Sequence, residues 1–284
     1  FRHLRRRRHG SAVQAALCDR AEFAEKRRHR RNAEAISGRT IALNGLNEST
    51  PATANPLIIF DCDGVLVDSE PISLAVLMDM LGDSGISIGV ERASALFLGR
   101  SLASMVKTAE DEYGLAIDDA FLTAMRQKLY ARFRAELRPT VDIIETLERL
   151  EAEGIAWCVA SSSQPGRIAL SLTVAGIRPR FDPPIFSATM VERGKPAPDL
   201  FLHAAASMGR APGECIVIED SPAGIMAARA AQMRVLAYTG GSHTGLADYR
   251  AELERLKPET QFDAMADLLQ LVLPAGRPRD NPDA

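Results

Sequence analysis

No apolar run in this sequence approaches the roughly 20 uninterrupted residues that a membrane-spanning helix needs. Cysteine is also scarce, and no CxxC pair is formed by Cys18, Cys62, Cys158 and Cys215. These absences argue against a membrane protein and against a disulfide-stapled secreted domain. We therefore expect packing thiols, no membrane partner and a cytoplasmic location.

Residues 1–56 lack the apolar segment of a secretory signal, although they are rich in basic residues. They carry 12 Lys and Arg against 5 Asp and Glu, which gives a net charge of +7. Because the whole chain carries −3, the residues from 57 onward carry −10. The acidic body argues against a nucleic-acid partner, although the basic arm leaves that alternative open. We expect residues 1–56 to be a disordered basic extension, or translated sequence upstream of the true start.

From residue 57 onward, short apolar runs alternate with helical patterns. The strand-like runs are 57–60, 155–160, a weaker run at 185–186, 215–218 and 235–238. The helical patterns between and after them are 141–153, 167–175, 198–208 and 223–231. This alternation predicts an α/β fold with a Rossmann-like parallel sheet, and the continuous apolar runs fit a sheet that is covered on both faces.

One interval contains helical patterns only. These patterns are 72–81, 91–97, 102–113 and 118–137, and Arg138-Pro139 ends the last of them. We expect a small helical cap domain over 71–138, inserted into a catalytic core of 57–70 and 139–275, with a disordered tail at 276–284. Beside the carboxyl end of the sheet, such a block would cover a site and exclude water.

Two aspartates, Asp61 and Asp63, directly follow the first strand-like run, and Gly64 follows them. Ligands of open parallel sheets bind outside the carboxyl ends of the strands. A carboxylate pair at that place can bind a divalent cation, or divide nucleophilic from acid/base work. The alternative is an ordinary acidic turn, since Asp and Gly are common turn formers.

Three further polar segments follow predicted strands. They are Ser161-Ser162-Ser163, the segment 194–199 with Lys195, and the segment 219–224 with Glu219 and Asp220. Each alone has an ordinary explanation as a helix cap, a surface charge or a stiff loop. At one edge of one sheet, however, they supply the hydroxyls, the cation and the carboxylates that phosphoryl transfer requires.

The segments FDCDGVLVDSEP, SSS, GKPAPD and EDSPAGI, in this order, resemble the haloacid dehalogenase-like hydrolase superfamily. The branch most similar contains β-phosphoglucomutase and small sugar-phosphate phosphatases, and the resemblance covers about residues 57 to 240. It implies that Asp61 is the nucleophile and Asp63 the general acid/base. It also implies that Ser161, Ser162 and Lys195 hold the phosphoryl group. Mg²⁺ would be bound by Asp61, Asp220 and the Asp63 main-chain carbonyl, with Glu219 assisting.

Family dehalogenases lack an acid/base at the position of Asp63, so that residue favours phosphate-ester chemistry. The mutase has a cap segment GxSRxxSL, and this chain has Leu102 at the position of its arginine, which favours a hydrolase. Arg100 is a candidate substrate contact in this loop, or a solvated charge at a helix start. We expect a Mg²⁺-dependent, monomeric phosphatase of a small phosphorylated metabolite, a sugar phosphate or a sugar-acid phosphate such as 6-phosphogluconate. A β-phosphoglucomutase-like isomerase and a catalytically silent phospho-ligand binding protein are the alternatives.

Overall fold

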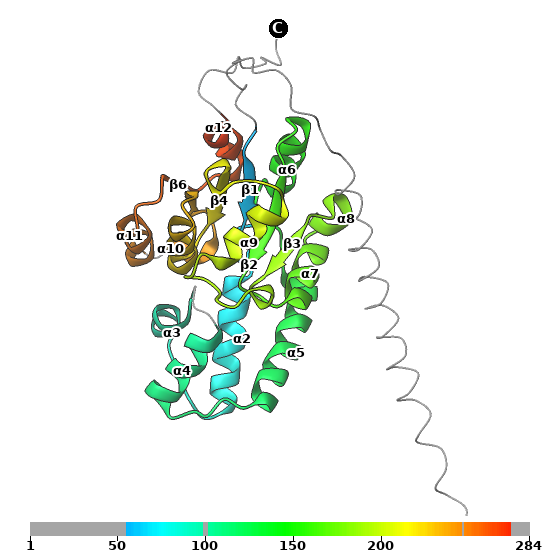
Figure 1. Ribbon diagram of the computed structural model, residues 1–284. Helices are drawn as coiled ribbons and strands as arrows, with labels where there is room; N and C mark the ends of the chain where they lie inside the picture. Colours follow the sequence, from blue (N-terminus) through cyan, green and yellow to red (C-terminus); the bar gives the residue numbers. More distant parts are fainter. Residues whose placement is uncertain (1–54, 99–101, 246, 274–284) are drawn as a thin grey trace, which may run out of the picture. The chain divides into compact units, whose positions relative to one another are not determined.

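The computed structural model describes residues 55–98, 102–245 and 247–273, all within one compact unit, Thr53–Ala284 (Figure 1). The expected extension over 1–56, apart from its last two residues, lies outside the described residues. So do the expected tail at 276–284, Cys18 and the candidate contact Arg100. No helix of the described residues is long and apolar enough to cross a membrane.

A six-stranded sheet forms the centre of this unit, and all of its pairings are parallel. The strands are β1 Leu57–Phe60, β2 Trp157–Ser161, β3 Ile185–Ser187, β4 Cys215–Glu219, β5 Arg234–Tyr238 and β6 Thr260–Phe262. Their order is β3-β2-β1-β4-β5-β6, which is the doubly wound order of a Rossmann-like fold. The predicted α/β fold class is confirmed, and β6 is an addition that the sequence did not suggest.

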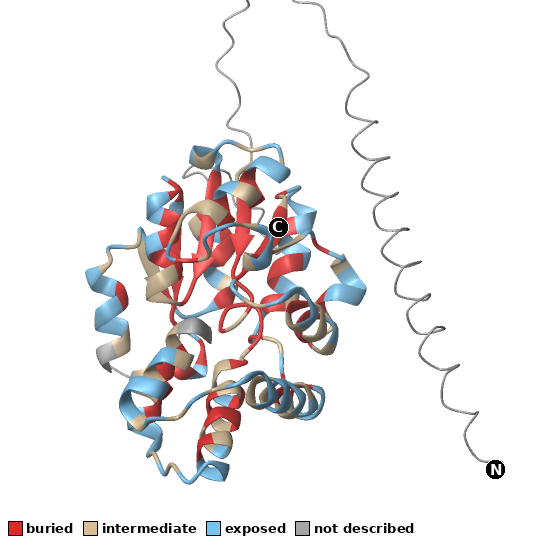
Figure 2. Ribbon diagram, turned by 60° about the horizontal axis from the view of Figure 1, so that its bottom comes forward, coloured by how far each residue is buried: buried red, intermediate tan, exposed pale blue. Residues whose placement is uncertain are grey.

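The two faces of the sheet are buried by different helices, because successive strand residues point to opposite faces. Ile58 and Phe60 belong to the apolar cluster that includes α6 Ile143–Ala152, α7 Pro165–Val174 and α12 Leu268–Val272. Leu57 and Ile59 belong to a second cluster with α9 Asp199–Ser207, α10 Pro222–Ala230 and α11 Ala247–Arg255. The buried residues accordingly concentrate in the sheet and on the inner sides of the helices (Figure 2).

Three of the four cysteines take part in this packing. Cys62, Cys158 and Cys215 are free thiols and are buried, which confirms the expected packing role for these three. Burial raises the pKa of the Cys62 thiol well above its usual range, with the Asp63 and Asp61 charges adding to the effect. Burial also raises the pKa values of Cys158 and Cys215, so all three thiols stay protonated in the folded protein.

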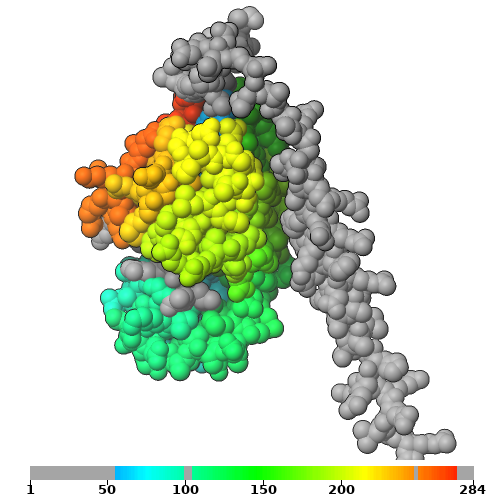
Figure 3. All heavy atoms as spheres, in the orientation of Figure 1, coloured from blue at the N-terminus to red at the C-terminus, as the bar shows by residue number. Residues whose placement is uncertain are grey.

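Between β1 and β2 the chain forms a block of helices only, as predicted. They are α2 Glu70–Asp83, α3 Val90–Phe97, α4 Leu102–Tyr113 and α5 Asp119–Glu136. Asp118 caps α5 by accepting a hydrogen bond from the Phe121 backbone N–H at 2.7 Å. The block has an apolar cluster of its own, which includes Leu77, Leu81 and Phe97. Figure 1 shows α2 and α5 running beside each other away from the sheet, and Figure 3 shows the block as a lobe against the core.

Candidate active site

The strand order reverses between β1 and β4, and this is the place where open α/β sheets bind their ligands. Asp61 follows β1 directly, and its backbone N–H donates to the Ile218 carbonyl of β4 at 2.9 Å. Asp220 follows the last residue of β4. The topology thus brings two carboxylates, separated by more than 150 residues of chain, to one point at the sheet edge.

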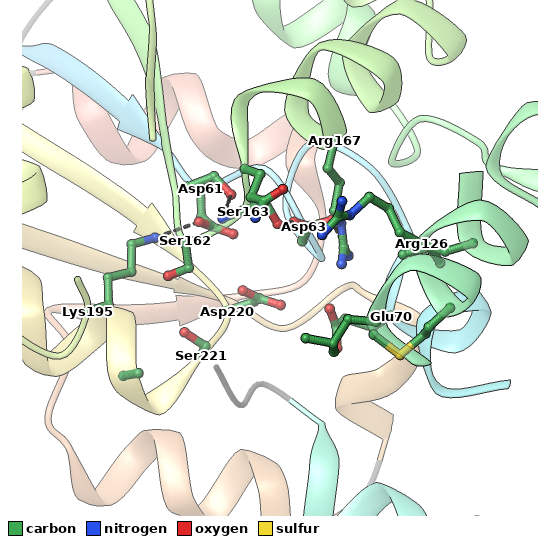
Figure 4. A pocket seen from close by; sticks show the side chains of 16 residues that line it. Asp61, Asp63, Glu70, Arg126, Ser162, Ser163, Arg167, Lys195, Asp220 and Ser221 are labelled. Carbon is green, nitrogen blue, oxygen red and sulfur yellow. Dashed lines mark hydrogen bonds and ion pairs between the residues drawn. The ribbon is translucent and has the colours of Figure 1, made fainter. Parts of the chain in front are cut away.

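A cavity of about 240 Å³ opens at this edge (Figure 4). It is lined by six of the residues that the sequence singled out: Asp61, Asp63, Ser161, Ser162, Lys195 and Asp220. Glu219 does not line it, and Arg100 lies outside the described residues. The opposite wall comes from the helical block, with Leu122, Met125, Arg126 and Leu129 of α5.

Lys195 is the centre of a buried ionic cluster. Its Nζ donates to Asp61 Oδ1 at 2.5 Å, to Glu219 Oε1 at 2.5 Å and to the Ala160 carbonyl at 3.0 Å. All three protons of the ammonium group are therefore used. Burial alone would lower the pKa of Lys195, but the Asp61 and Glu219 charges raise it well above its usual value. Lys195 remains a cation, directed at the carboxylate that the resemblance makes the nucleophile.

Asp61 faces an excess of negative charge. Burial raises its pKa well above the usual range, and Lys195 lowers it while Glu219, Asp220 and Asp63 raise it further. Its second oxygen, Oδ2, accepts no hydrogen bond from the described residues. A group with one free oxygen and several like charges nearby is suited to bind a cation.

Glu219 is fully buried, and both of its oxygens are occupied. Oε1 accepts from Lys195, while Oε2 accepts from the backbone N–H groups of Asp220 and Ser221, each at 3.0 Å, and from the Ser221 hydroxyl at 2.9 Å. A Cβ on Gly224 would lie 1.8 Å from Glu219 Cδ, so only glycine fits there. Glu219 thus fixes Lys195 and the loop after β4, and its expected assistance to a metal is indirect in this arrangement.

Asp63 lies in a different environment from Asp61. Oδ1 accepts from Ser69 Oγ at 2.7 Å and from Arg167 Nη2 at 2.8 Å, and Oδ2 accepts from Ser163 Oγ at 2.7 Å. Burial would raise the pKa of Asp63, but Arg167 and the hydroxyl donors outweigh it and lower the pKa. The two aspartates therefore lie in different environments, and the donors around Asp63 favour its ionised form.

Asp220 is paired with a histidine that the sequence did not suggest. His243 Nε2 lies 2.8 Å from Asp220 Oδ2, and both side chains are buried. Burial raises the pKa of Asp220, and His243 offsets part of that rise. The other oxygen, Oδ1, accepts no hydrogen bond from the described residues. His243 lies in the short 3₁₀ helix Ser242–Gly245 after β5, where no periodic pattern marks it as buried.

Arg167 and Glu70 are further pocket residues that sequence reasoning did not single out. Arg167 falls inside the helical pattern 167–175, so its arginine looks like any first-turn charge. Glu70 follows Ser69 in the motif segment and begins α2. Burial raises the pKa of Glu70, and the Asp63 charge adds to this.

The donor set fits a hard cation such as Mg²⁺. Within the described residues no group of three or more His, Cys, Asp and Glu side chains is arranged to hold a metal ion. Mg²⁺, however, is commonly held by one or two carboxylates together with waters and a substrate phosphate. The free oxygens of Asp61 and Asp220 provide those carboxylates, and a cation there would offset the burial and the neighbouring negative charges that raise both pKa values.

Gly64 keeps this part of the site compact. Its φ is +83°, and a Cβ built on it would lie 1.9 Å from Asp220 Oδ2. We predict that Gly64→Ala displaces Asp220 and lowers kcat/KM by about 10²-fold or more, which phosphate-release kinetics would measure. Gly85→Ala is the matched control, because Gly85 has the same φ of +83° and nothing within 4 Å of a new Cβ.

Gly85→Ala isolates the backbone strain, which is about 1–2 kcal/mol in the left-handed region. It should lower the free energy of unfolding by that amount and leave kcat/KM near the wild-type value. If Gly64→Ala and Gly85→Ala affected turnover equally, crowding of Asp220 would not be the cause.

The fold and the site define an α/β protein with a helical cap. Side chains suited to phosphoryl transfer gather where the strand order reverses, between β1 and β4. Residues 56–232 match the haloacid dehalogenase-like hydrolase family. Protein SUPPRESSOR OF QUENCHING 1, chloroplastic, of Arabidopsis thaliana is 34% identical over 187 residues, which are 63% of this chain and 17% of the plant protein. The chain thus spans less than a fifth of that relative.

Two further proteins match over most of their length. 6-Phosphogluconate phosphatase of Escherichia coli is 28% identical, and the match covers 66% of this chain and 83% of the relative. The other is a haloacid dehalogenase-like protein of unknown function from Agrobacterium tumefaciens, whose crystal structure matches this chain with a TM-score of 0.68. The two sequences are 36% identical, and the match covers 77% of this chain and 98% of the other.

The chain belongs to the haloacid dehalogenase-like hydrolase family, in the cap-bearing branch that contains sugar-phosphate phosphatases. It is an enzyme of the phosphoric monoester hydrolase type. A phosphorylated small molecule is the substrate that this family implies, and the family is generally Mg²⁺-dependent.

Proposed function

We propose that the protein is a Mg²⁺-dependent phosphatase that hydrolyses a small sugar phosphate or sugar-acid phosphate through an aspartyl-phosphate on Asp61. One observation carries the proposal: Asp61 and Asp63 line the same cavity but have different partners. Lys195 donates to Asp61, whereas Arg167, Ser69 and Ser163 donate to Asp63. Two carboxylates with the same partners would be an acidic cluster without a division of chemical roles. Two carboxylates with different partners can take different roles, and the family resemblance assigns the attack to Asp61 and proton transfer to Asp63.

The reaction has two steps. A carboxylate oxygen of Asp61 attacks phosphorus, and the bond from phosphorus to the ester oxygen breaks. Asp63, which takes up a proton when the substrate replaces one of its donors, passes that proton to the leaving oxygen. Water then attacks phosphorus while Asp63 takes its proton, and the bond from phosphorus to Asp61 breaks. The products are the free alcohol and inorganic phosphate, and Asp61 is a carboxylate again.

The remaining pocket residues hold the phosphoryl group. Lys195 supplies positive charge at Asp61, and Ser161 and Ser162 supply hydroxyls at the end of β2. Mg²⁺ would be held by the side chains of Asp61 and Asp220 and by the Asp63 carbonyl. When bound, it offsets the negative charge that the phosphoryl group and the carboxylates share.

The cap side of the pocket favours a substrate with a second polar or anionic end. Arg126 of α5 lines the cavity across from the sheet edge and forms no ion pair with the described residues. Leu122, Met125 and Leu129 give the same wall an apolar surface that excludes water. A sugar-acid phosphate such as 6-phosphogluconate has a carboxylate at the end opposite its phosphate, and a guanidinium binds carboxylates well.

The proposal includes the domain division into a core of 57–70 and 139–275 and a cap of 71–138. It also includes a monomer that acts on a small molecule in the cytoplasm, with no nucleic-acid or membrane partner. An isomerase of the β-phosphoglucomutase type would need to grip a second phosphate, and Leu102 at its arginine position argues against that. A silent binding protein is disfavoured because Asp61, Asp63, Lys195 and Asp220 are all in place.

A screen of phosphorylated metabolites with Mg²⁺ tests the function, with inorganic phosphate release as the readout. We expect 6-phosphogluconate to be hydrolysed faster than glucose 6-phosphate, which lacks the carboxylate, and an excess of EDTA to stop both reactions. Restoring Mg²⁺ should restore them. Unchanged rates in EDTA would remove the metal from the mechanism, and faster isomerisation of β-glucose 1-phosphate than phosphate release would favour the mutase.

A further inference from the structure

Arg167 connects the acid/base to both helices that join the core and the helical block. It lies in the first turn of α7, and its Nη2 donates to Asp63 Oδ1 at 2.8 Å and to Ser73 Oγ of α2 at 3.1 Å. Its Cζ lies 5.3 Å from the centroid of the Phe133 ring of α5. α2 leads from the sheet into the block, and α5 leads back. A single guanidinium therefore contacts the acid/base and both connecting helices.

The contacts of Asp63 show what this connection controls. Ser69, Ser163 and Arg167 hold its carboxylate, and Figure 4 shows Lys195 on Asp61 and Arg167 on Asp63 at opposite sides of the pocket. To protonate a leaving oxygen, the carboxyl group must come within hydrogen-bond reach of it. A carboxylate held by these donors has to exchange at least one of them for the substrate. Among these donors, Arg167 contacts both α2 and α5.

The guanidinium itself is incompletely satisfied. Its Nε is buried and has no hydrogen-bond partner among the described residues. Buried hydrogen-bond donors without an acceptor are rare in native structures, so this one requires a physical explanation. An unpaired donor has an explanation if the helical block takes two positions, the one seen here and another closer to the substrate. The guanidinium would then form different hydrogen bonds in each position and leave a donor unpaired in one of them.

We propose that Arg167 is a positioning residue that makes the orientation of Asp63 depend on the position of the helical block. α2 and α5 hold the guanidinium through Ser73 and Phe133, and the guanidinium holds the carboxylate. This inference rests on the proposed function, because it acts through the acid/base of that reaction. It predicts that loss of Arg167 impairs proton transfer more than formation of the bond from Asp61 to phosphorus.

The leaving group separates these two effects. Hydrolysis of 6-phosphogluconate expels an alkoxide-like oxygen, which needs the proton of Asp63. p-Nitrophenolate leaves with little proton assistance. With Arg167→Met we expect kcat for 6-phosphogluconate to fall about 10²-fold, as for the loss of general acid/base catalysis. In stopped-flow experiments with p-nitrophenyl phosphate, we expect a burst of p-nitrophenolate at close to the wild-type rate, followed by a slow steady state, because water activation in the second step also uses Asp63.

Two variants and one control make the test specific. Arg167→Lys keeps the charge and should recover part of the activity, and Ser73→Ala, which cuts only the link to α2, should lower kcat for 6-phosphogluconate by a smaller factor. Arg178→Met changes an exposed arginine of α8, Ile177–Phe181, and should match the wild type.

The outcomes separate the two proposals. If the wild type releases no phosphate from either ester, the proposed function fails. The second case is an active wild type and an Arg167→Met variant in which the burst rate with p-nitrophenyl phosphate falls by the same factor as kcat for 6-phosphogluconate. Arg167 is then only structural, and the inference is overturned. Unchanged kinetics in Arg167→Met would overturn it as well.

Discussion

Replacing Asp61 with Asn is expected to lower kcat by at least about 10⁴-fold, as removal of the nucleophile does in other covalent enzymes. The amide nitrogen and oxygen of Asn have the shape of the carboxylate, but neither forms a stable bond to phosphorus under these conditions. The Lys195 ammonium can still donate to the amide oxygen, so its bond to position 61 is retained. Phosphate release and far-UV circular dichroism, measured on the same preparation, check both parts of this expectation.

The matched control is Asp79→Asn, which makes the same chemical change at an exposed position of α2. It should keep wild-type turnover. The covalent mechanism would be refuted by an Asp61→Asn protein that is folded and still releases phosphate at a substantial rate.

Replacing Lys195 with Met is expected to have the second-largest effect, on both stability and activity. Its ammonium is the shared partner of Asp61 and Glu219, whose side chains are buried with it. Removing one partner of a buried ion pair leaves an uncompensated charge, which costs about 3–5 kcal/mol. We expect urea unfolding near neutral pH to show a loss of stability of that order. Turnover should fall with it, because the cation beside the phosphoryl group is gone.

The pH dependence of Lys195→Met has a definite sign. Burial already raises the pKa of Asp61, and Lys195 is the charge that lowers it. Without Lys195 the folded protein holds a proton on Asp61 more tightly than the unfolded chain does. Stability then rises as the pH falls, so the deficit should be largest near neutral pH and shrink toward the ordinary carboxyl pKa of about 4.

Two variants accompany this measurement. Lys107→Met removes an exposed lysine paired with Asp111, and solvent-exposed ion pairs contribute little to stability. The double variant Lys195→Met with Glu219→Gln removes one of the orphaned charges and should regain stability without regaining activity. An Lys195→Met protein as stable as the wild type would contradict the buried cluster described here.

Most of the fold could be predicted because the sheet is covered on both faces. Leu57–Phe60 is apolar throughout and Cys215–Glu219 is apolar up to its last residue, so both strands stand out between helical patterns. The elements that the sequence did not suggest are short or polar. β6 has a single buried residue, Phe262, and α8 has five residues after Gly176, whose φ is +75°. Local sequence carries little information about such elements, since tertiary contacts decide them.

The site could be predicted where its residues follow strands directly. Asp61, Ser161 and Asp220 each lie at or next to a strand end, and the rule that parallel sheets bind ligands there brings them together. Arg167 and His243 could not be found this way. Arg167 reaches Asp63 over 104 residues of chain, and only the folded structure shows that contact.

Glu219 illustrates a further limit of sequence reasoning. Its neighbour Asp220 is also acidic, and both follow the apolar run of β4, so the sequence cannot tell which one faces the cavity. In the fold, Glu219 is the last residue of β4 and points to Lys195 and the loop backbone, while Asp220 lines the pocket. The alternation of side chains along a strand decides the difference.

Chemical trapping of the intermediate tests the central claim most directly. The enzyme is mixed with ³²P-labelled substrate and Mg²⁺, quenched in acid within the first turnover, reduced with borohydride and mapped by peptide mass spectrometry. An aspartyl-phosphate would give acid-stable, hydroxylamine-labile label on the protein, and reduction would convert Asp61 to homoserine. Label on another residue, or phosphate release with no protein-bound label at any time point, would contradict the account.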